Sequence, residues 1–275
     1  MKAVQNEEDQ SSPSGDGGYE AIILAGGLGT RLRSVVNDVP KCMAPVNGIP
    51  FINFIVSYLK NEGVTKFIFS LGYKHELITA YLDKTFPELD KHYSIETEQL
   101  GTGGAIKKAC EFVSGENVLA LNGDTLFNID IHSFLKEHKE KEAECTVALK
   151  EMKDFSRYGS VEVNKDDIIT AFHEKKYCEK GLINGGIYAM QTKSFLNKNL
   201  PTVFSFEKDY LEKFVLDGKI AGFKKDYYFI DIGIPEDYQK FQNDYQIILS
   251  KRKYEQSDYS SLTEFFFEGL LDLID

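Results

Sequence analysis

The sequence predicts a single α/β domain with a central mixed, mostly parallel sheet, and three observations support this prediction. Ala21–Ala25 is a continuous apolar run, which is typical of a strand buried on both faces of a parallel sheet. Helix-like and strand-like segments then alternate, as in βαβ units with helices on both faces of the sheet. Beyond Glu144, segments rich in β-branched and aromatic residues indicate mixed or antiparallel strands that cover a pocket.

Each element follows from the spacing of the apolar residues. A period of about 3.6 residues predicts helices, and short apolar runs predict strands. In the first half we expect helix Phe51–Leu59, strand Thr65–Leu71, helices His75–Leu82 and Gly103–Phe112, and strand Asn117–Leu121. In the second half we expect strands Cys145–Leu149, Gly159–Val163, Ile168–Phe172 and Gly185–Met190, then helix Pro235–Leu249, which begins at a proline.

The two ends of the chain differ from the domain between them, which we expect to span residues 19–248. Residues 1–18 are rich in Ser, Gly, Asp, Glu and Gln, which predicts a disordered tail. Residues 249–275 predict a polar linker, Lys251–Ser261, and an amphipathic helix, Leu262–Ile274. This last helix either packs on its own domain, which we expect, or forms a contact between two copies in a homodimer.

Composition and charge argue against several classes of protein. The chain has 275 residues, of which 32 are Lys or Arg and 43 are Asp or Glu, and its net charge of -11 argues against a nucleic-acid partner. The four cysteines form no C-x-x-C pair and follow no hydrophobic signal segment, which predicts free thiols in the cytoplasm. No apolar run approaches the roughly 20 residues that cross a bilayer, so we expect no membrane partner. The dispersed histidines predict no histidine-based metal site.

A glycine-rich loop, Leu24–Arg33, follows the first strand directly and carries three glycines. Because glycine has no Cβ, backbone N–H groups here can approach a phosphate closely, and Arg31 and Lys41 supply positive charge. Two well-known phosphate loops do not fit. A dinucleotide fingerprint needs a third glycine where Leu32 stands, and a P-loop needs a Gly-Lys-Ser/Thr that is missing.

This loop, with Pro40-Lys41 downstream, resembles the signature of the sugar-phosphate nucleotidyltransferase family. The resemblance runs from about Tyr19 to about Tyr245 and recurs, in the order of the family, at Leu100-Gly-Thr-Gly-Gly104, Leu121-Asn-Gly-Asp-Thr125, Phe172-His-Glu-Lys175, Asn184-Gly-Gly-Ile-Tyr188 and Asp231-Ile-Gly-Ile-Pro235. It implies a Rossmann-like (GT-A-like) domain. It also implies transfer of a nucleoside monophosphate from an NTP to a sugar 1-phosphate, with release of pyrophosphate.

Within the family, the compact domain, Arg157-Tyr-Gly159 and Gly181–Tyr188 resemble the guanylyltransferases that act on D-glycero-α-D-manno-heptose 1-phosphate. GTP and this heptose 1-phosphate are therefore the substrates that the resemblance implies. Other specificities remain open, such as a mannose 1-phosphate guanylyltransferase or a uridylyl- or thymidylyltransferase. A catalytically silent nucleotide-sugar sensor is the alternative outside the enzymes, but the metal acids and Arg31 that it would lose are present.

The resemblance also implies which residues form the site. The catalytic residues are Arg31, Lys41 and Asp124. The nucleotide-binding residues are Leu24, Ala25, Gly26, Gly27, Gly29, Thr30, Arg31, Glu96, Gly101, Thr102 and Gly123. The sugar-phosphate-binding residues are Gly159, Glu174, Lys175 and Asn184. Glu96 and its neighbour Glu98 are acceptors compatible with the N–H donors of guanine, although uracil and thymine also offer such a donor.

Asp124 and Asp231 are the expected ligands of Mg²⁺. Each follows an apolar run, which places it at the end of a strand, where open α/β sheets bind their ligands. Carboxylate oxygens suit this hard cation, which bridges phosphates, although a carboxylate at a strand end can instead cap a helix. A D-x-D glycosyltransferase is an alternative that fails, because Asn122 stands two residues before Asp124.

Two residues depart from the pattern of the family. Cys42 follows the Pro-Lys pair, and Lys176 follows Glu-Lys, at positions where proline is common in relatives. The loops beside Lys41 and Lys175 are therefore expected to differ in shape from those of relatives.

Overall fold

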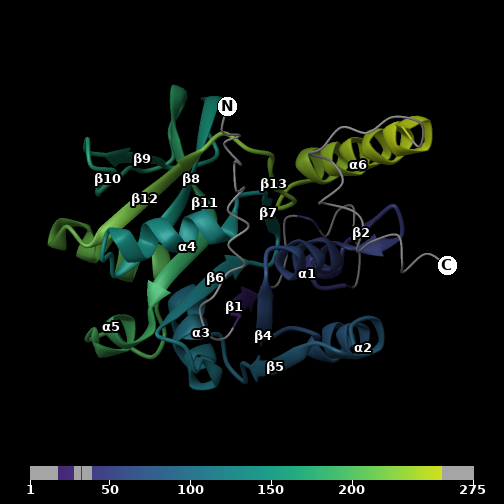
Figure 1. Cartoon of the computed structure of the whole chain (residues 1–275), viewed down its shortest axis with the longest axis horizontal. Coiled ribbons are helices and arrows are strands. Elements are labelled where there is room, and N and C mark those ends of the chain that lie inside the picture. Colours follow the sequence, from purple (N-terminus) through teal and green to yellow (C-terminus); the bar gives the residue numbers. More distant parts are fainter. Residues whose placement is uncertain (1–17, 28–31, 33–38, 256–275) are drawn as a thin grey trace, which may run out of the picture.

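The computed structural model describes residues 18–27, 32 and 39–255, which form one α/β domain (Figure 1). Within these residues, nine strands build a central sheet. In chain order they are β1 (Tyr19–Leu24), β4 (Val64–Leu71), β5 (Asp90–Ile95), β6 (Asn117–Asn122), β8 (Cys145–Phe155), β9 (Ser160–Val163), β10 (Ile169–Phe172), β11 (Cys178–Gln191) and β12 (Ile220–Lys225). The predicted fold class is confirmed.

The order of the strands explains where the sheet can bind a ligand. β6, β1, β4 and β5 lie side by side and are parallel. β11 is antiparallel to β6 and β8, whereas β12 runs parallel to β8. β9 and β10 extend the sheet from the first half of β11. From β1 the chain continues outward through β4 and β5 and then returns to β6 on the other side of β1, so a topological switch point lies between β1 and β6.

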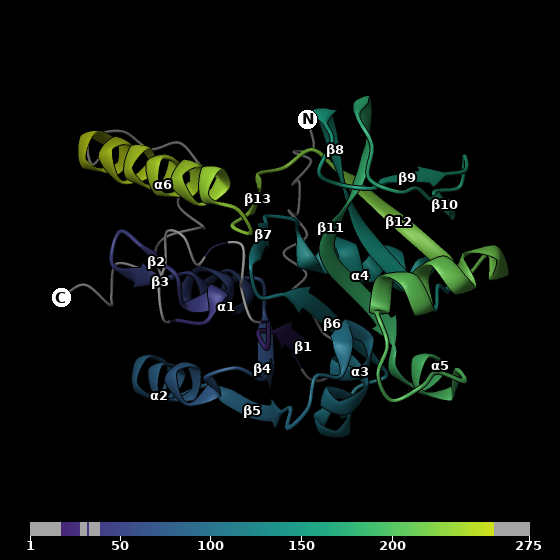
Figure 2. The same cartoon turned by 180° about the vertical axis from the view of Figure 1, so that it is seen from behind.

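Helices cover both faces of the sheet, as the alternating pattern predicts (Figure 2). One apolar core includes side chains of α1, α2, α4 and α6, and the other includes side chains of α3, α5 and the short helix η3. Successive residues of β1 enter opposite cores: Ile22 lies in one, and Ala21 and Ile23 lie in the other. The helices are α1 (Phe51–Asn61), α2 (His75–Thr85), α3 (Gly101–Ala109), α4 (Ile131–Glu140), α5 (Thr192–Asn197), η3 (Phe206–Glu212) and α6 (Pro235–Glu255).

The last described helix, α6, packs against α1. Phe241 contacts Phe51 and Phe54 edge to face, with ring centroids 5.3 and 5.2 Å apart. Such pairs add to the stabilisation that burial of the rings provides. α6 runs to Glu255, so it is six residues longer than the helix predicted over Pro235–Leu249. The predicted helix Leu262–Ile274 and nearly all of the predicted tail lie outside the described residues.

Several elements were not predicted. α4 begins after Asp130, whose carboxylate accepts a hydrogen bond from the Ser133 N–H at 2.6 Å, so this N-cap was a signal available in the sequence. β5 is mostly polar and β12 ends in two lysines, so pairing with neighbouring strands decides their structure. Small elements complete the fold: η1 (Lys41–Met43), β2 (Pro45–Val46), β3 (Ile49–Pro50), η2 (Cys110–Phe112), β7 (Thr125–Phe127), η4 (Val215–Asp217) and β13 (Phe229–Asp231).

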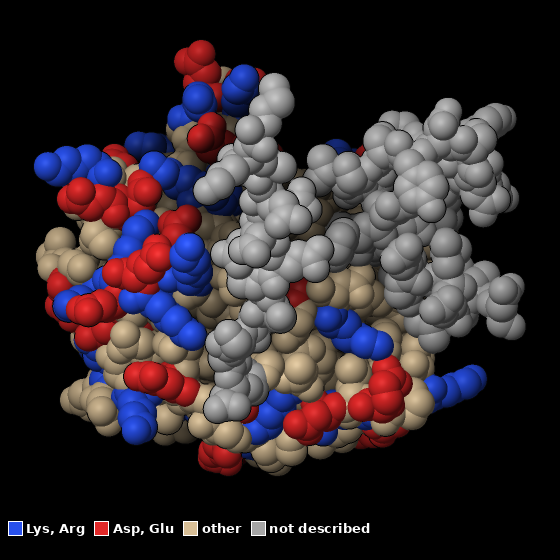
Figure 3. All heavy atoms as spheres, in the orientation of Figure 1, with Lys and Arg blue, Asp and Glu red and all other residues tan. Residues whose placement is uncertain are grey.

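On the face seen in Figure 3, Lys and Arg side chains are interspersed with Asp and Glu side chains over the described residues. None of the described helices has the combination of length and apolar character needed to cross a membrane.

Candidate active site

A cavity of about 1090 Å³ opens at the carboxyl ends of β1 and β6, at the topological switch point. It is lined by all of the predicted site residues that the structure describes: Leu24, Ala25, Gly26, Gly27, Lys41, Glu96, Gly101, Thr102, Gly123, Asp124, Gly159, Glu174, Lys175, Asn184 and Asp231. The predicted residues Gly29, Thr30 and Arg31 lie outside the described residues. Glu98 is exposed and does not line the cavity.

Where β1 and β6 end at the cavity, their backbones approach closely. The Gly123 N–H donates to the Leu24 carbonyl at 2.8 Å. A Cβ on Gly123 would lie 2.5 Å from that oxygen, and a Cβ on Gly26 would lie 2.9 Å from the Glu96 carboxylate. The glycines are therefore required by the space available, and they leave the backbone after β1 open to the cavity.

Glu96 is fixed from two sides. Its Oε2 accepts a hydrogen bond from the Leu100 N–H at 3.1 Å, and its Oε1 accepts one from Ser70 Oγ at 3.4 Å. The following helix α3 begins at Gly101, whose φ of +70° suits glycine and whose absent Cβ leaves room for the Phe204 carbonyl. This end of the cavity thus combines the Glu96 carboxylate, fixed by two hydrogen bonds, with the N-terminus of α3.

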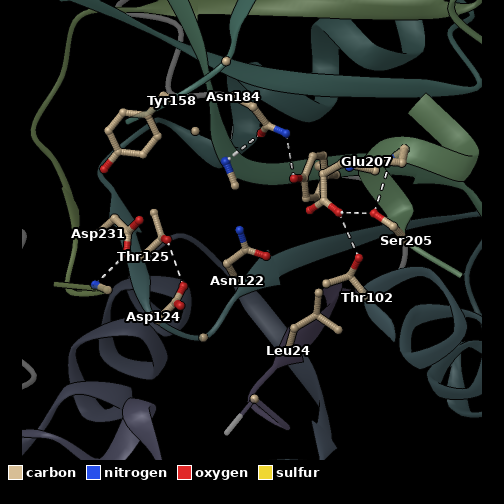
Figure 4. Close-up of a pocket in the computed structure, with 18 of the residues that line it drawn as sticks. Leu24, Thr102, Asn122, Asp124, Thr125, Tyr158, Asn184, Ser205, Glu207 and Asp231 are labelled. Carbon is tan, nitrogen blue, oxygen red and sulfur yellow. Dashed lines mark hydrogen bonds between the residues drawn. The ribbon is translucent and has the colours of Figure 1, made fainter. Parts of the chain in front are cut away.

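Asp124 and Asp231 are brought together by a small two-stranded sheet (Figure 4). β7 and β13 are antiparallel, with Asp231 opposite Thr125, and the Ile232 N–H donates to the Asp124 carbonyl at 3.0 Å. The ammonium group of Lys41 forms an ion pair with Asp124 and lies 3.6 Å from Asp231 Oδ1. The Asp124 and Asp231 side chains are 32% and 29% exposed, so both remain accessible from the cavity.

The electrostatics of this cluster fit a divalent cation. Two carboxylates and one ammonium leave a net charge of minus one. Burial raises the pKa of Asp231, and the negative charge of Asp124 raises it further, against the opposing effect of Lys41. An added cation would relieve this repulsion. No cluster of three or more His, Cys, Asp or Glu side chains occurs among the described residues, and two carboxylates suit Mg²⁺, which keeps positions for phosphate oxygens and water.

At another wall of the cavity, a bulge in β11 directs Asn184 inward. The register between β11 and β8 shifts between Asn184 and Tyr188, where Gly185 and Gly186 stand, and Gly186 has a φ of +74°. The Gly186 N–H donates to Asn184 Oδ1 at 2.9 Å, and Asn184 Nδ2 donates to the Tyr188 hydroxyl at 2.9 Å. The orientation of this amide is therefore fixed before any substrate binds.

Gly159, Glu174 and Lys175 surround the same side of the cavity. A Cβ on Gly159 would lie 2.3 Å from the His173 carbonyl, so only glycine fits where the segments before β9 and after β10 meet. Glu174 and Lys175 are exposed residues between β10 and β11. Lys175 therefore places an exposed ammonium group at the cavity wall, and such a group suits the binding of a phosphate.

A model of the family described as nucleotidyl transferase matches residues 20–247. The chain belongs to this family. It is similar to curated enzymes named D-glycero-alpha-D-manno-heptose 1-phosphate guanylyltransferase. That of Aneurinibacillus thermoaerophilus is 50% identical over 227 residues, which is 82% of this chain and 98% of the relative. That of Campylobacter jejuni is 47% identical over 222 residues, or 81% and 98% of the two chains.

Solved structures agree with this membership. The crystal structure of HddC from Yersinia pseudotuberculosis superimposes with a TM-score of 0.76 at 39% identity, over 82% of this chain and 99% of that one. A second structure of HddC, complexed with GMP-PN, has a TM-score of 0.75 at 38% identity and the same coverage. The protein is therefore an enzyme, a nucleotidyltransferase.

The cavity of this nucleotidyltransferase holds residues that sequence reasoning missed. Glu207 follows the apolar Phe204–Phe206 segment, and Tyr158 lies within a motif that was used only for resemblance. Burial raises the pKa of the Tyr158 hydroxyl, and the charge of Asp231 raises it further. Arg157 forms an ion pair with Asp237 of α6 beside the cavity. Motif spacing contains no signal for Glu207, because its surroundings come from distant segments.

Cys42, which departs from the family pattern beside Lys41, fits into a buried position of the fold. Cys42 is buried behind Lys41 at the cavity wall, where burial and the charge of Asp124 raise the pKa of its thiol to about 12. This thiol is therefore neutral near pH 7 and acts as a small apolar side chain.

Proposed function

We propose that this nucleotidyltransferase transfers GMP from GTP to D-glycero-α-D-manno-heptose 1-phosphate, giving GDP-heptose and pyrophosphate. The observation that carries the proposal is the cluster of Lys41, Asp124 and Asp231 in one cavity. The same cavity holds the predicted nucleotide-binding residues, on what we call its nucleotide side, and the predicted sugar-phosphate-binding residues, on its sugar side. The specificity is supported by the names of two relatives at 50% and 47% identity, which the chain matches over 98% of their length.

The reaction forms a bond between a phosphate oxygen of the sugar 1-phosphate and the α-phosphorus of GTP, while the bond from that phosphorus to pyrophosphate breaks. The second pKa of a phosphate monoester is about 6, so the attacking oxygen is already ionised near pH 7 and needs no general base. The enzyme then has two tasks, which are to bring two anions together and to stabilise the leaving pyrophosphate.

Charges at the cavity suit the first task. Lys175 would bind the phosphate of the sugar, while Lys41 would bind phosphate oxygens of the nucleotide near the carboxylates that it contacts. Asp124 and Asp231 would hold Mg²⁺, which, when bound, supplies positive charge to the reacting phosphates. Because the protein has a net charge of -11, this local positive charge is needed where the two substrates meet.

Polar groups at the two ends of the cavity suit recognition. The carboxylate of Glu96, held by Leu100 and Ser70, can accept hydrogen bonds from the N1–H and exocyclic amine of guanine. Asn184 can donate to or accept from sugar hydroxyls, and the Glu174 carboxylate can accept from them. All four cysteines are free, and three of them are buried, which supports our placing the reaction in the reducing cytoplasm.

The proposal is tested by pyrophosphate release from a matrix of substrates in the presence of Mg²⁺. The four common NTPs and dTTP are each paired with heptose, mannose, glucose and N-acetylated sugar 1-phosphates. Turnover restricted to GTP and the heptose 1-phosphate is expected. Preferred turnover of another pair would replace the substrates while leaving the chemistry, and silence across the matrix would overturn the proposal.

A further inference from the structure

Glu207 is an acidic side chain in the cavity that the proposed reaction does not use. It lies in the first turn of η3, which packs against α3. Ser205 caps this helix, since its hydroxyl accepts a hydrogen bond from the Lys208 N–H at 3.2 Å. An anion here is unfavourable for a cavity that binds two anionic substrates, so its presence calls for a specific role.

The Glu207 carboxylate accepts hydrogen bonds from two hydroxyl groups. Thr102 Oγ1 donates to Oε2 at 2.9 Å, and Ser205 Oγ donates to the same oxygen at 3.1 Å (Figure 4). A third hydroxyl, that of Tyr188, lies beside the carboxylate, whose charge raises its pKa. Thr102 Oγ1 in turn accepts from the Phe206 N–H at 2.9 Å, so its hydroxyl proton is directed toward Glu207.

Tyr188 connects this carboxylate to Asn184. The side chain of Tyr188 is buried, and its ring packs edge to face on Phe206 with centroids 4.8 Å apart. Burial raises the pKa of the hydroxyl, and the charge of Glu207 raises it further, so the group stays protonated and can donate. Its oxygen accepts from Asn184 Nδ2 at 2.9 Å. A continuous path therefore runs from Asn184 through Tyr188 and Glu207 to Thr102.

The two ends of this path lie on the two sides of the cavity. Thr102 follows Gly101 at the start of α3, on the nucleotide side, and Asn184 lies in the β11 bulge, on the sugar side. We propose that Glu207 is a positioning residue that fixes the start of α3 and the amide of Asn184 in one geometry, a role that rests on the proposed function. It acts through Thr102, whose hydroxyl donates to its carboxylate, and through Tyr188, whose hydroxyl lies beside it.

A carboxylate suits this role because it only accepts hydrogen bonds and has about four acceptor sites. The hydroxyls of Thr102 and Ser205 can therefore share Oε2 without competition, and the Tyr188 hydroxyl can lie beside the same carboxylate. The two donors fill the acceptor sites of Oε2. A positioning role for Glu207 follows from these bonds.

The test compares Glu207→Ala and Glu207→Gln with the parent, using the full chain and whichever substrate pair of the matrix the parent turns over. Misplacement of reacting groups by about 1 Å can cost about a hundredfold in rate, so kcat of Glu207→Ala is expected to fall about tenfold to a hundredfold. The KM for each substrate is expected to stay within about threefold of the parent's, less than 1 kcal/mol. Glu207→Gln retains one oxygen acceptor and should recover part of kcat.

Glu212→Gln is the matched control. Glu212 is an exposed acid at the last position of the same helix, so its variant removes the same charge at the edge of the cavity without removing a hydrogen bond of the path. It is expected to keep the parent's kcat. Tyr188→Phe removes the connecting hydroxyl while it retains the ring contact with Phe206, and its effect should be strongly non-additive with Glu207→Gln.

Several results would overturn the proposal. A raised KM with an unchanged kcat in the Glu207 variants would show that Glu207 binds substrate directly. An equal loss of kcat in Glu207→Gln and Glu212→Gln would show that the loss comes only from the change in charge. A lower melting temperature with an unchanged kcat would leave only a structural role. If Glu207→Ala does not fold, Tyr188→Phe with the parent's kcat overturns the proposal by itself. If the proposed substrates are wrong, the parent enzyme will prefer another substrate pair in the matrix, and this result does not depend on the Glu207 variants.

Discussion

The ammonium group of Lys41 lies 3.6 Å from the Asp231 carboxylate while it is also paired with Asp124. A single lysine thus holds together an acid in the turn before β7 and an acid at the end of β13. Replacing one acid with the isosteric amide keeps the shape of this cluster but removes the charge that would hold Mg²⁺. Asp124→Asn is therefore expected to reduce pyrophosphate release by about a hundredfold to a thousandfold, since the metal supplies several kcal/mol. The measurement is steady-state turnover at saturating Mg²⁺.

The melting temperature of Asp124→Asn should stay near the parent's, because Asp124 is partly exposed and its amide can keep the hydrogen bond from Thr125. Asp226→Asn is a suitable control. Asp226 is 73% exposed, pairs with Lys150 and does not line the cavity. Near-parental turnover of Asp124→Asn would remove Asp124 from the metal site.

Gly233 limits the space around the same cluster. Its N–H donates to Asp231 Oδ1 at 2.7 Å. A Cβ at this position would lie 2.7 Å from Asp231 Oδ1 and 2.8 Å from Lys41 Nζ, closer than such atoms can approach. Gly233→Ala is therefore expected to displace both side chains and to reduce kcat by about tenfold or more.

The concentration of Mg²⁺ at half-maximal activity should also rise in Gly233→Ala, because one proposed ligand is moved. Gly115→Ala is the control for an added methyl group, since its Cβ would meet its nearest neighbour, the Asn117 carbonyl, at 3.3 Å and far from the cavity. An unchanged Mg²⁺ dependence would contradict the assignment of Asp231.

The contrast between these residues shows what the sequence can predict. Asp124 and the glycines after β1 were predictable because a parallel strand carries its ligand-binding residues at its carboxyl end, directly next in the sequence. The meeting of Asp124 with Asp231 depends on the register of β7 and β13, which are three residues each and too short for a pattern. Glu207 depends on Thr102 and Tyr188, which come from other segments. Local patterns therefore predicted the strand ends, the pairing of Asp124 with Asp231 was expected from the context of the family, and the surroundings of Glu207 were not predicted.

Lys175 and Lys176 offer a matched pair of neighbouring cations. Both are exposed, but only Lys175 lines the cavity. A hydrogen bond to a charged group contributes about 1.5–3 kcal/mol, so Lys175→Ala is expected to raise the KM for the sugar 1-phosphate roughly tenfold to a hundredfold. The KM for GTP should change little. Lys176→Ala is expected to match the parent in both constants, and equal effects of the two variants would show only a general loss of positive charge.

His138 makes the stability of the fold depend on pH. It is buried between Thr146 and Asn117, at 2.8 and 3.1 Å, and burial lowers its pKa from 6.5 to about 4. Below pH 6.5 the unfolded chain binds a proton that the native state does not bind until about pH 4. The free energy of unfolding therefore falls as pH falls through this window, by up to about 3 kcal/mol.

Urea unfolding of the parent and of His138→Gln at pH 7, 6 and 5 measures this contribution. Glutamine can donate to Asn117 and accept from Thr146, but it does not titrate. The variant is expected to be less stable than the parent at pH 7, because its shape differs, and to lose less stability between pH 7 and 5. The difference between the two slopes isolates His138 from the carboxylates, which titrate in both proteins. Parallel pH profiles would show that His138 binds its proton equally in the folded and unfolded states.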